Sequence, residues 1–153
     1  MLQKKISKKN IIKVITHSPL VAIDLLIRCK KKYLLGLRAN EPAKNRLFVP
    51  GGRIRKNETL RQARNRIFTA ETGILAGSHK FDFKRIGEHF YKNCFFSKKI
   101  GTHYVTLCFL VKVKEKKVPK MGQHRRWTWL TKEEILSTAT VHPYTKEYFR
   151  KGL

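Results

Sequence analysis

The sequence GGRIRKNETLRQARNRIFTAETGI, residues 51–74, predicts a glycine-rich loop that leads into a helix. Gly51 and Gly52 interrupt an apolar stretch, and glycine permits a close backbone approach that a side chain would prevent. Asn57 is the expected N-cap of the helix, and Gly73 is its expected end.

The expected helix combines an apolar stripe with one carboxylate. The stripe consists of Leu60, Ala63, Ile67 and Ala70, which recur at helical spacing. Glu71 lies in the last turn, next to the stripe, in an otherwise basic helix. Backbone groups at the start of a helix bind phosphate, and magnesium prefers oxygen ligands. The Glu71 carboxylate and the Gly51 carbonyl would therefore form a minimal site for one magnesium ion.

Strand patterns occur on both sides of this segment. Apolar or alternating runs predict strands at 20–28, 33–38, 46–50, 81–91, 102–113 and 127–130. Residues 1–17 have a weak helical pattern, a capping box at Thr131 begins a later helix, and Pro143 begins a last one. The sequence has no repeat or second core, so residues 1–153 are expected to form one α/β domain. A mixed β-sheet covered by helices on both faces is the expected architecture.

Two further features bear on chemistry. Asp24 is an acid inside the apolar run at 20–28, and a buried carboxylate is costly unless it is paired. It is either a structural Asp bonded to backbone or arginine, or a residue of the site. Gln123 and His124 are adjacent on a predicted loop before the last strand. Histidine is the natural general base near neutral pH, and the Gln123 carbonyl can complete a metal shell.

The net charge of +25 is the unusual feature of the composition. It is compatible with a polyanionic partner, but the basic residues are scattered and form no compact block interleaved with aromatics. Compositional drift in an AT-rich genome is therefore favoured over nucleic-acid binding. No apolar run approaches the length of a membrane span, so no membrane association is expected. Cys29, Cys94 and Cys108 fit no zinc or disulfide framework, which favours a reducing cytoplasm.

Residues 51–74 resemble the Nudix box, a motif of the Nudix hydrolase superfamily. The matching residues are Gly52, Glu58, Arg66, Phe68, Glu71, Gly73 and Ile74. Ile67 and Ala70 stand where the box usually has glutamate. This departure is compatible with an inactive site, and it is also similar to the variant box of the GDP-mannose mannosyl hydrolases.

The resemblance to the GDP-mannose mannosyl hydrolases extends over nearly the whole chain. It rests on the segments SPLVAIDLLI (18–27), LLGLRAN with the following Pro42 (34–42), FVPGGRI (48–54), THYV (102–105), QH (123–124) with WL (129–130) after it, and VH (141–142). The resemblance implies the Nudix fold, a homodimer, and one magnesium ion held by Gly51, Glu71 and Gln123. It implies that His124 is the base and that Arg38 and Arg53 stabilise the departing GDP. It also gives Asp24 and Tyr104 roles in orienting or stabilising sugar and nucleotide, and it places Lys5, Ile6 and Ile11 at nucleotide-binding positions.

Several residues depart from that likeness or are expected to be structural. Ile11 replaces an aromatic that could stack on the base, and Arg125 and Arg126 replace acidic residues after the Gln-His pair. Glu58 and Arg66 are expected to form a structural ion pair. The remaining histidines are expected to serve packing or the surface; they are His17, His79, His89, His103 and His142.

The leading hypothesis is a Mg2+-dependent hydrolase that splits GDP-mannose, or GDP-glucose, into GDP and free sugar. Attack would occur at the anomeric carbon with inversion, because one metal on the diphosphate suits a leaving group better than it suits attack on phosphorus. The first alternative is a Nudix pyrophosphohydrolase that cleaves the P–O–P bond of another nucleoside diphosphate derivative. The second is a catalytically silent basic protein that binds nucleic acid.

Overall fold

A seven-stranded mixed sheet forms the centre of the protein in the computed structural model, which describes residues 6–116 and 124–150. The main strand order is β3-β2-β1-β6-β5, while β4 also pairs with β1 and β7 with β2. Strands β1 and β6 are parallel, and the other pairs are antiparallel. The strands are β1 (Leu20–Cys29), β2 (Lys32–Arg38), β3 (Leu47–Phe48), β4 (Gly51–Arg53), β5 (Phe81–Tyr91), β6 (Thr102–Lys112) and β7 (His124–Thr131).

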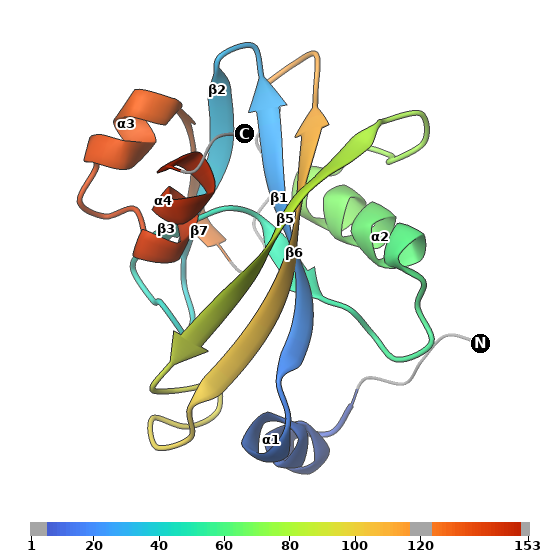
Figure 1. The fold of residues 1–153 in the computed structure, drawn as a ribbon, viewed down its shortest axis with the longest axis vertical. Coiled ribbons are helices and arrows are strands. Elements are labelled where there is room, and N and C mark those ends of the chain that lie inside the picture. The colour runs from blue at the N-terminus through green and yellow to red at the C-terminus, as the bar shows by residue number, and fades with distance from the viewer. Residues whose placement is uncertain (1–5, 117–123, 151–153) are drawn as a thin grey trace.

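Helices cover both faces of the sheet, as Figure 1 shows. Helix α2 (Leu60–Thr72) lies on one face, where Ile67 and Phe68 join a buried cluster with alternate residues of β1. Helices α3 (Lys132–Ser137) and α4 (Pro143–Arg150) lie on the other, where Tyr148 and Phe149 join a second cluster. The predicted α/β architecture, a mixed sheet between helices, is confirmed.

Strand β1 has apolar side chains on both of its faces, so both faces of the sheet must be covered by helices. Ile23, Leu25 and Ile27 belong to the cluster under α2, whereas Leu26 belongs to the cluster under α4. Successive side chains of a strand point to opposite faces, so an almost continuous apolar strand is typical of a sheet buried on both sides. Asp24, at 7% exposure, therefore projects on the face opposite Ile23 and Leu25.

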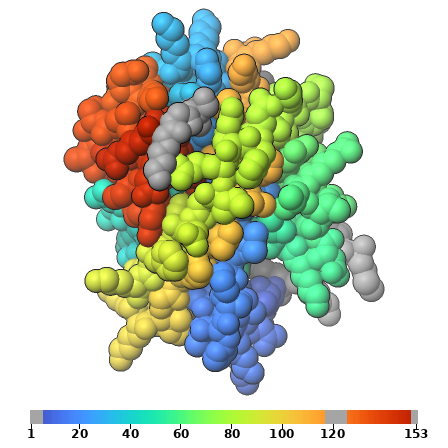
Figure 2. Space-filling view, viewed as in Figure 1, coloured from blue at the N-terminus to red at the C-terminus, as the bar shows by residue number. Residues whose placement is uncertain are grey.

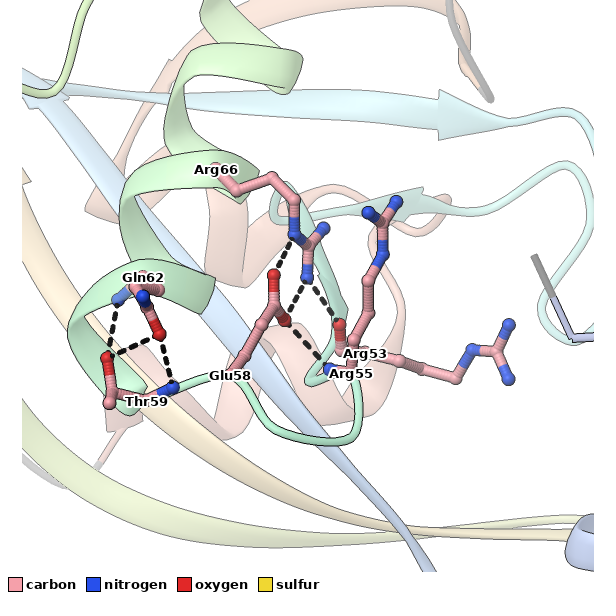
Figure 3. A network of polar contacts seen from close by, with 6 residues as sticks. All are labelled: Arg53, Arg55, Glu58, Thr59, Gln62 and Arg66. Carbon is pink, nitrogen blue, oxygen red and sulfur yellow. Dashed lines mark hydrogen bonds and ion pairs between the residues drawn. The ribbon is translucent and has the colours of Figure 1, made fainter. Parts of the chain in front are cut away.

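Helix α2 ends as predicted but begins differently. Gly73 is the C-cap in the left-handed region, with φ of 70°. Thr59, and not Asn57, is the N-cap, and it forms a capping box with Gln62 (Figure 3). Asn57 instead has a positive φ of 65° in the preceding turn, a conformation that asparagine tolerates better than most residues. The Asn57 N-cap prediction was therefore wrong by two residues.

Glu58 and Arg66 tie the start of α2 to strand β4. The Nε of Arg66 lies 2.5 Å from Glu58 Oε1, and its Nη2 donates to Glu58 Oε2 at 2.8 Å (Figure 3). The same Nη2 donates to the Arg53 carbonyl at 2.9 Å, and Glu58 Oε2 accepts from the Arg55 amide at 2.8 Å. These bonds confirm the predicted structural ion pair, and the Arg66 guanidinium lowers the pKa of Glu58.

Strand β5 is an edge of the sheet and lies on the surface. Figure 2 shows it crossing one face of the molecule between α2 and the C-terminal helices. Phe83, Ile86 and Phe90 are all more than half exposed along this strand. Near one end of the sheet, helix α1 (Lys8–His17) contacts β6.

Candidate functional site

An open cleft of about 150 Å3 lies where β1, β2, β4, β5 and β6 come together. Five of the residues predicted for the site line it: Asp24, Arg38, Gly51, Arg53 and Tyr104. The other lining side chains include Phe48, Val49, His89, Tyr91 and Thr106. Asp24 is the one carboxylate among the described lining residues, and Arg38 and Arg53 are the cations. The fold thus gathers five predicted residues that are far apart in the sequence.

Asp24 and Gly51 are in close contact at the bottom of the cleft. They are partners in the antiparallel pairing of β1 with β4. A Cβ added to Gly51 would lie 2.5 Å from Asp24 Oδ1 and 2.7 Å from the Ile23 carbonyl oxygen. Only glycine fits at position 51 for this reason, and the absence of a side chain lets the Asp24 carboxylate lie against the loop.

A hydrogen-bonded group of buried side chains holds Asp24 from the opposite side. The Tyr148 hydroxyl donates to Asp24 Oδ2 at 2.5 Å, and it lies 3.0 Å from Thr106 Oγ1 and 3.3 Å from His89 Nε2. The pKa of Asp24 is raised to about 6, because the effect of burial is larger than the opposite effects of the Tyr148 hydrogen bond and the Arg38 charge. Burial also lowers the pKa of His89 to about 4, so this imidazole is neutral at neutral pH.

The two arginines are placed by different contacts. Arg38 Nε donates to the Pro42 carbonyl at 2.8 Å, and its guanidinium lies 5.9 Å from the centre of the Phe48 ring. The backbone carbonyl of Arg53 accepts from Arg66, so the Nudix-box ion pair fixes the strand that carries Arg53. Both arginines act electrostatically on Tyr104, whose pKa burial raises. Two cations beside one cleft suit a diphosphate.

The residues predicted for magnesium are only partly described. Gly51 lines the cleft, and Glu71 is half-buried in the last turn of α2, while Gln123 lies outside the described residues. Within residues 6–116 and 124–150, no three His, Cys, Asp or Glu side chains form a metal-binding group. Ile67 packs on Gly52, and Glu71 follows Ile67 by one helical turn, so it lies on the helix side that faces β4. A backbone carbonyl and a carboxylate on adjacent elements are oxygen donors of the kind magnesium prefers.

Ile67 and Ala70 occupy the positions where the box usually has glutamate. Ile67 is 2% exposed and belongs to the core cluster, with its Cγ1 3.2 Å from where a Gly52 Cβ would be. Ala70 is exposed on the helix surface. Of the three acidic ligand positions of the usual box, only the one at Glu71 retains a carboxylate here.

His124 begins strand β7, so the prediction that it lies on a loop before a shorter strand was wrong. Pairing with β2 continues past Trp127, and His124 is the backbone partner of Arg38 after a register shift at Leu37. This pairing brings the backbone of the predicted base beside an arginine that lines the cleft.

Of the predicted nucleotide-binding residues near the N-terminus, the two that the structure describes, Ile6 and Ile11, are not among the described residues that line the cleft. Lys5 lies outside the described residues, Ile6 is 45% exposed, and Ile11 is 4% exposed within α1. Because Ile11 is buried, its side chain is expected to pack α1 against the rest of the protein and not to contact a nucleotide. Nucleotide contact at these three positions stays a prediction.

Four polar side chains in or beside the cleft had not been expected in the site. His89 had been assigned to packing or the surface, but it is buried at 3% exposure and lines the cleft. Tyr91 and Thr106 also line it, and Tyr148 reaches Asp24 from α4. The single available signal was strand alternation, which places Gly87, His89 and Tyr91 on one face of β5.

The NUDIX domain model matches residues 18–151 of the chain. The chain belongs to the Nudix family. Membership supports a hydrolase, and Nudix hydrolases generally use a divalent metal such as Mg2+. The family assignment agrees with the loop–helix geometry of residues 51–73 and with the sheet between helices.

Curated relatives and solved structures are similar to this Nudix protein. The low-salt glycan biosynthesis protein Agl8 of Haloferax volcanii is 44% identical over 80 residues, which cover 51% of this chain and 49% of that protein. The chain thus spans about half the length of that relative. The MutT protein of Methanosarcina mazei has 22% identity and a TM-score of 0.66, and covers 87% of this chain and 92% of its own. The MutT Nudix hydrolase of Burkholderia pseudomallei has 17% identity and a TM-score of 0.73, with 90% and 100% coverage.

Among the described residues, no helix is long and apolar enough to cross a membrane. The three cysteines, Cys29, Cys94 and Cys108, are free and buried.

Proposed function

We propose that this Nudix protein hydrolyses a GDP-sugar, GDP-mannose or GDP-glucose, to GDP and the free sugar. Water would attack the anomeric carbon with inversion, and the bond from that carbon to the bridging oxygen of the diphosphate would break. The observation that carries the proposal is the burial of Ile67 against Gly52, where the usual box has a glutamate. A helix face with fewer carboxylates holds fewer cations, which disfavours attack on phosphorus.

The cleft supplies groups for both halves of such a substrate. Arg38 and Arg53 would bind the diphosphate and stabilise the charge that develops as GDP departs. Asp24 and Tyr104 would hydrogen-bond the sugar, and a carboxylate near the reacting carbon favours an oxocarbenium-like transition state. His124 would take the proton from the attacking water.

One magnesium ion would be held by the Gly51 carbonyl, Glu71 and Gln123. When bound, it would supply positive charge to the diphosphate leaving group. The similarity to a glycan biosynthesis protein supports sugar-nucleotide chemistry, although that match covers half of each chain. A homodimer and a cytoplasmic location remain predictions.

The alternative within the family is pyrophosphohydrolysis of another nucleoside diphosphate derivative. Family membership and the MutT-like structures favour it in general terms. Product analysis separates the two reactions. GDP-mannose and Mg2+ incubated with the protein should yield GDP and mannose, and His124→Gln should abolish this turnover while GDP binding persists. GMP and mannose 1-phosphate as products would overturn the proposal in favour of pyrophosphohydrolysis.

A further inference from the structure

Tyr148 links the C-terminal helix to the floor of the cleft. Its side chain is 2% exposed, and its hydroxyl donates to Asp24 Oδ2 at 2.5 Å, across 124 positions of sequence. Thr106 Oγ1 lies 3.0 Å and His89 Nε2 lies 3.3 Å from the same hydroxyl. The buried Tyr148 hydroxyl thus has three polar neighbours from three strands, which makes it the centre of a buried hydrogen-bond network.

The direction of these bonds follows from counting protons. A tyrosine hydroxyl has one proton, and in this geometry it is given to the Asp24 carboxylate. The Tyr148 oxygen can then only accept from Thr106 and His89. His89 must therefore carry its proton on Nε2 to make its bond, and the Thr106 hydroxyl must point toward the tyrosine.

The network leaves the two oxygens of Asp24 in different environments. Oδ2 is bound by Tyr148, whereas Oδ1 lies against Gly51, 2.5 Å from where a Cβ would be. A carboxylate fastened by one oxygen cannot rotate without breaking that bond. The other oxygen, Oδ1, is then held at a constant position in the cleft.

We propose that Tyr148 is a positioning residue that fixes the Asp24 carboxylate with Oδ1 toward the cleft, and that His89 and Thr106 set the direction of its hydrogen bond. The inference rests on the proposed function, since Asp24 is assigned there to the sugar. An oxygen fixed in this way accepts a hydrogen bond from a sugar hydroxyl without first paying the entropy of orienting a side chain.

Gly87 supports this role because it leaves the space that the network occupies. A Cβ at Gly87 would lie 2.6 Å from Thr106 Oγ1, 3.2 Å from His89 Nε2 and 3.3 Å from the Tyr148 hydroxyl. The Thr106, His89 and Tyr148 groups of the network therefore all lie close to Gly87. Any side chain at position 87 would displace at least one of them.

The first test compares two tyrosines of the same helix. Tyr148→Phe removes the bond to Asp24, while Tyr144→Phe removes a hydroxyl that bonds the Phe90 amide and carbonyl of β5 at 2.9 and 3.0 Å. For GDP-sugar hydrolysis, Tyr148→Phe should lower kcat about tenfold or more and leave KM nearly unchanged. Tyr144→Phe should leave kcat nearly unchanged. Equal effects of the two substitutions on kcat would overturn the assignment.

A double-mutant cycle tests whether Tyr148 acts through Asp24. In an Asp24→Ala background, Tyr148→Phe should cause no further loss of kcat, because no carboxylate is left to position. If the two losses multiply, Tyr148 acts by some other route and the proposal fails.

A readout without substrate separates this inference from the proposed function. Nitrogen-15 NMR of the histidine side chains at neutral pH should show His89 neutral and protonated on Nε2, and Tyr148→Phe should lower the share of that tautomer. Tyr144→Phe should leave the His89 tautomer unchanged. If no GDP-sugar is turned over but these shifts occur, the proposed function fails and the network stands. A His89 protonated on Nδ1 in the unsubstituted protein would contradict the network itself.

Discussion

Ile67 packs directly on Gly52, with Cγ1 3.2 Å from the position that a Cβ of Gly52 would take. The contact joins the first residue of the Nudix box to a position where the box usually has a metal-binding glutamate. Here that position belongs to the hydrophobic core. In this variant box, an apolar side chain packs in the core at a position that is usually acidic. Of the usual acidic positions on this helix, only that of Glu71 has a carboxylate.

Gly51 and Gly52 should respond differently to alanine. At Gly51 the new Cβ meets backbone and the Asp24 carboxylate at 2.7 and 2.5 Å, neither of which can move freely. At Gly52 it meets the flexible Ile67 side chain at 3.2 Å. Gly51→Ala should lower kcat/KM about a hundredfold by shifting Asp24, whereas Gly52→Ala should cost less than tenfold. Steady-state kinetics with thermal unfolding as a control measures this; similar losses in both variants would contradict it.

Arg66 should matter for stability more than for chemistry. It bonds Glu58 twice and the Arg53 carbonyl once, and hydrogen bonds to charged groups contribute about 1.5–3 kcal/mol each. Arg66→Ala should therefore lower the free energy of unfolding by about 2 kcal/mol or more, as denaturant titration would measure. Arg61, which is exposed in the first turn of the same helix, provides the control. If Arg61→Ala lowers the free energy of unfolding by the same amount, the stabilising role assigned to the Arg66 hydrogen bonds is contradicted.

Arg38 should contribute to diphosphate binding through its place in the cleft. Arg38→Gln should weaken the binding of GDP about tenfold or more, since bonds from a guanidinium to phosphate are charge-assisted. Arg28, whose Nε donates to the Lys30 carbonyl at the far end of the sheet, is the matched control. Calorimetric titration with GDP should show no change for Arg28→Gln. Unchanged affinity in Arg38→Gln would remove this residue from the site.

Asp24 should reduce the stability of the fold at neutral pH. Burial raises its pKa from 3.8 to about 6, so the folded state disfavours the ionised form. The group costs little below about pH 3, where it is protonated in both states, and its cost grows between about pH 3 and 6. Above pH 6 the cost is about 3 kcal/mol.

Asp24→Asn, which is neutral at every pH, should therefore be more stable than the unsubstituted protein above about pH 6 and nearly equally stable below about pH 3. Its hydrolysis rate should fall, because the amide lacks the charge that the sugar site requires. Urea unfolding of both proteins from about pH 3 to about pH 8 measures the difference. A stability difference that is independent of pH would contradict the assigned pKa.

Local patterns predicted much of the fold and part of the cleft. The strand at 20–28 was expected from its apolar run, and it is found as β1. The Gly73 cap and the pairing of Glu58 with Arg66 also depend on neighbouring residues, and both were found as predicted. Such features follow from short-range backbone and side-chain preferences.

Long-range contacts were beyond those patterns. Tyr148 meets Asp24 only because α4 folds back over the sheet, and nothing in the sequence near residue 148 indicates a partner 124 positions away. His89 has the same strand period as any packing residue, and its place in the cleft follows from the pairing of β5 with β6. Asn57 failed as an N-cap because a turn with positive φ competed for it.

Hydrolysis of GDP-mannose in oxygen-18 water, with Mg2+ and a single turnover, tests the central claim most directly. Mass spectrometry of the two products shows which atom water attacked. Attack at the anomeric carbon predicts that the label appears in mannose and that GDP contains none. Label in a phosphate group would contradict the account, because water would then have attacked phosphorus as in a pyrophosphohydrolase.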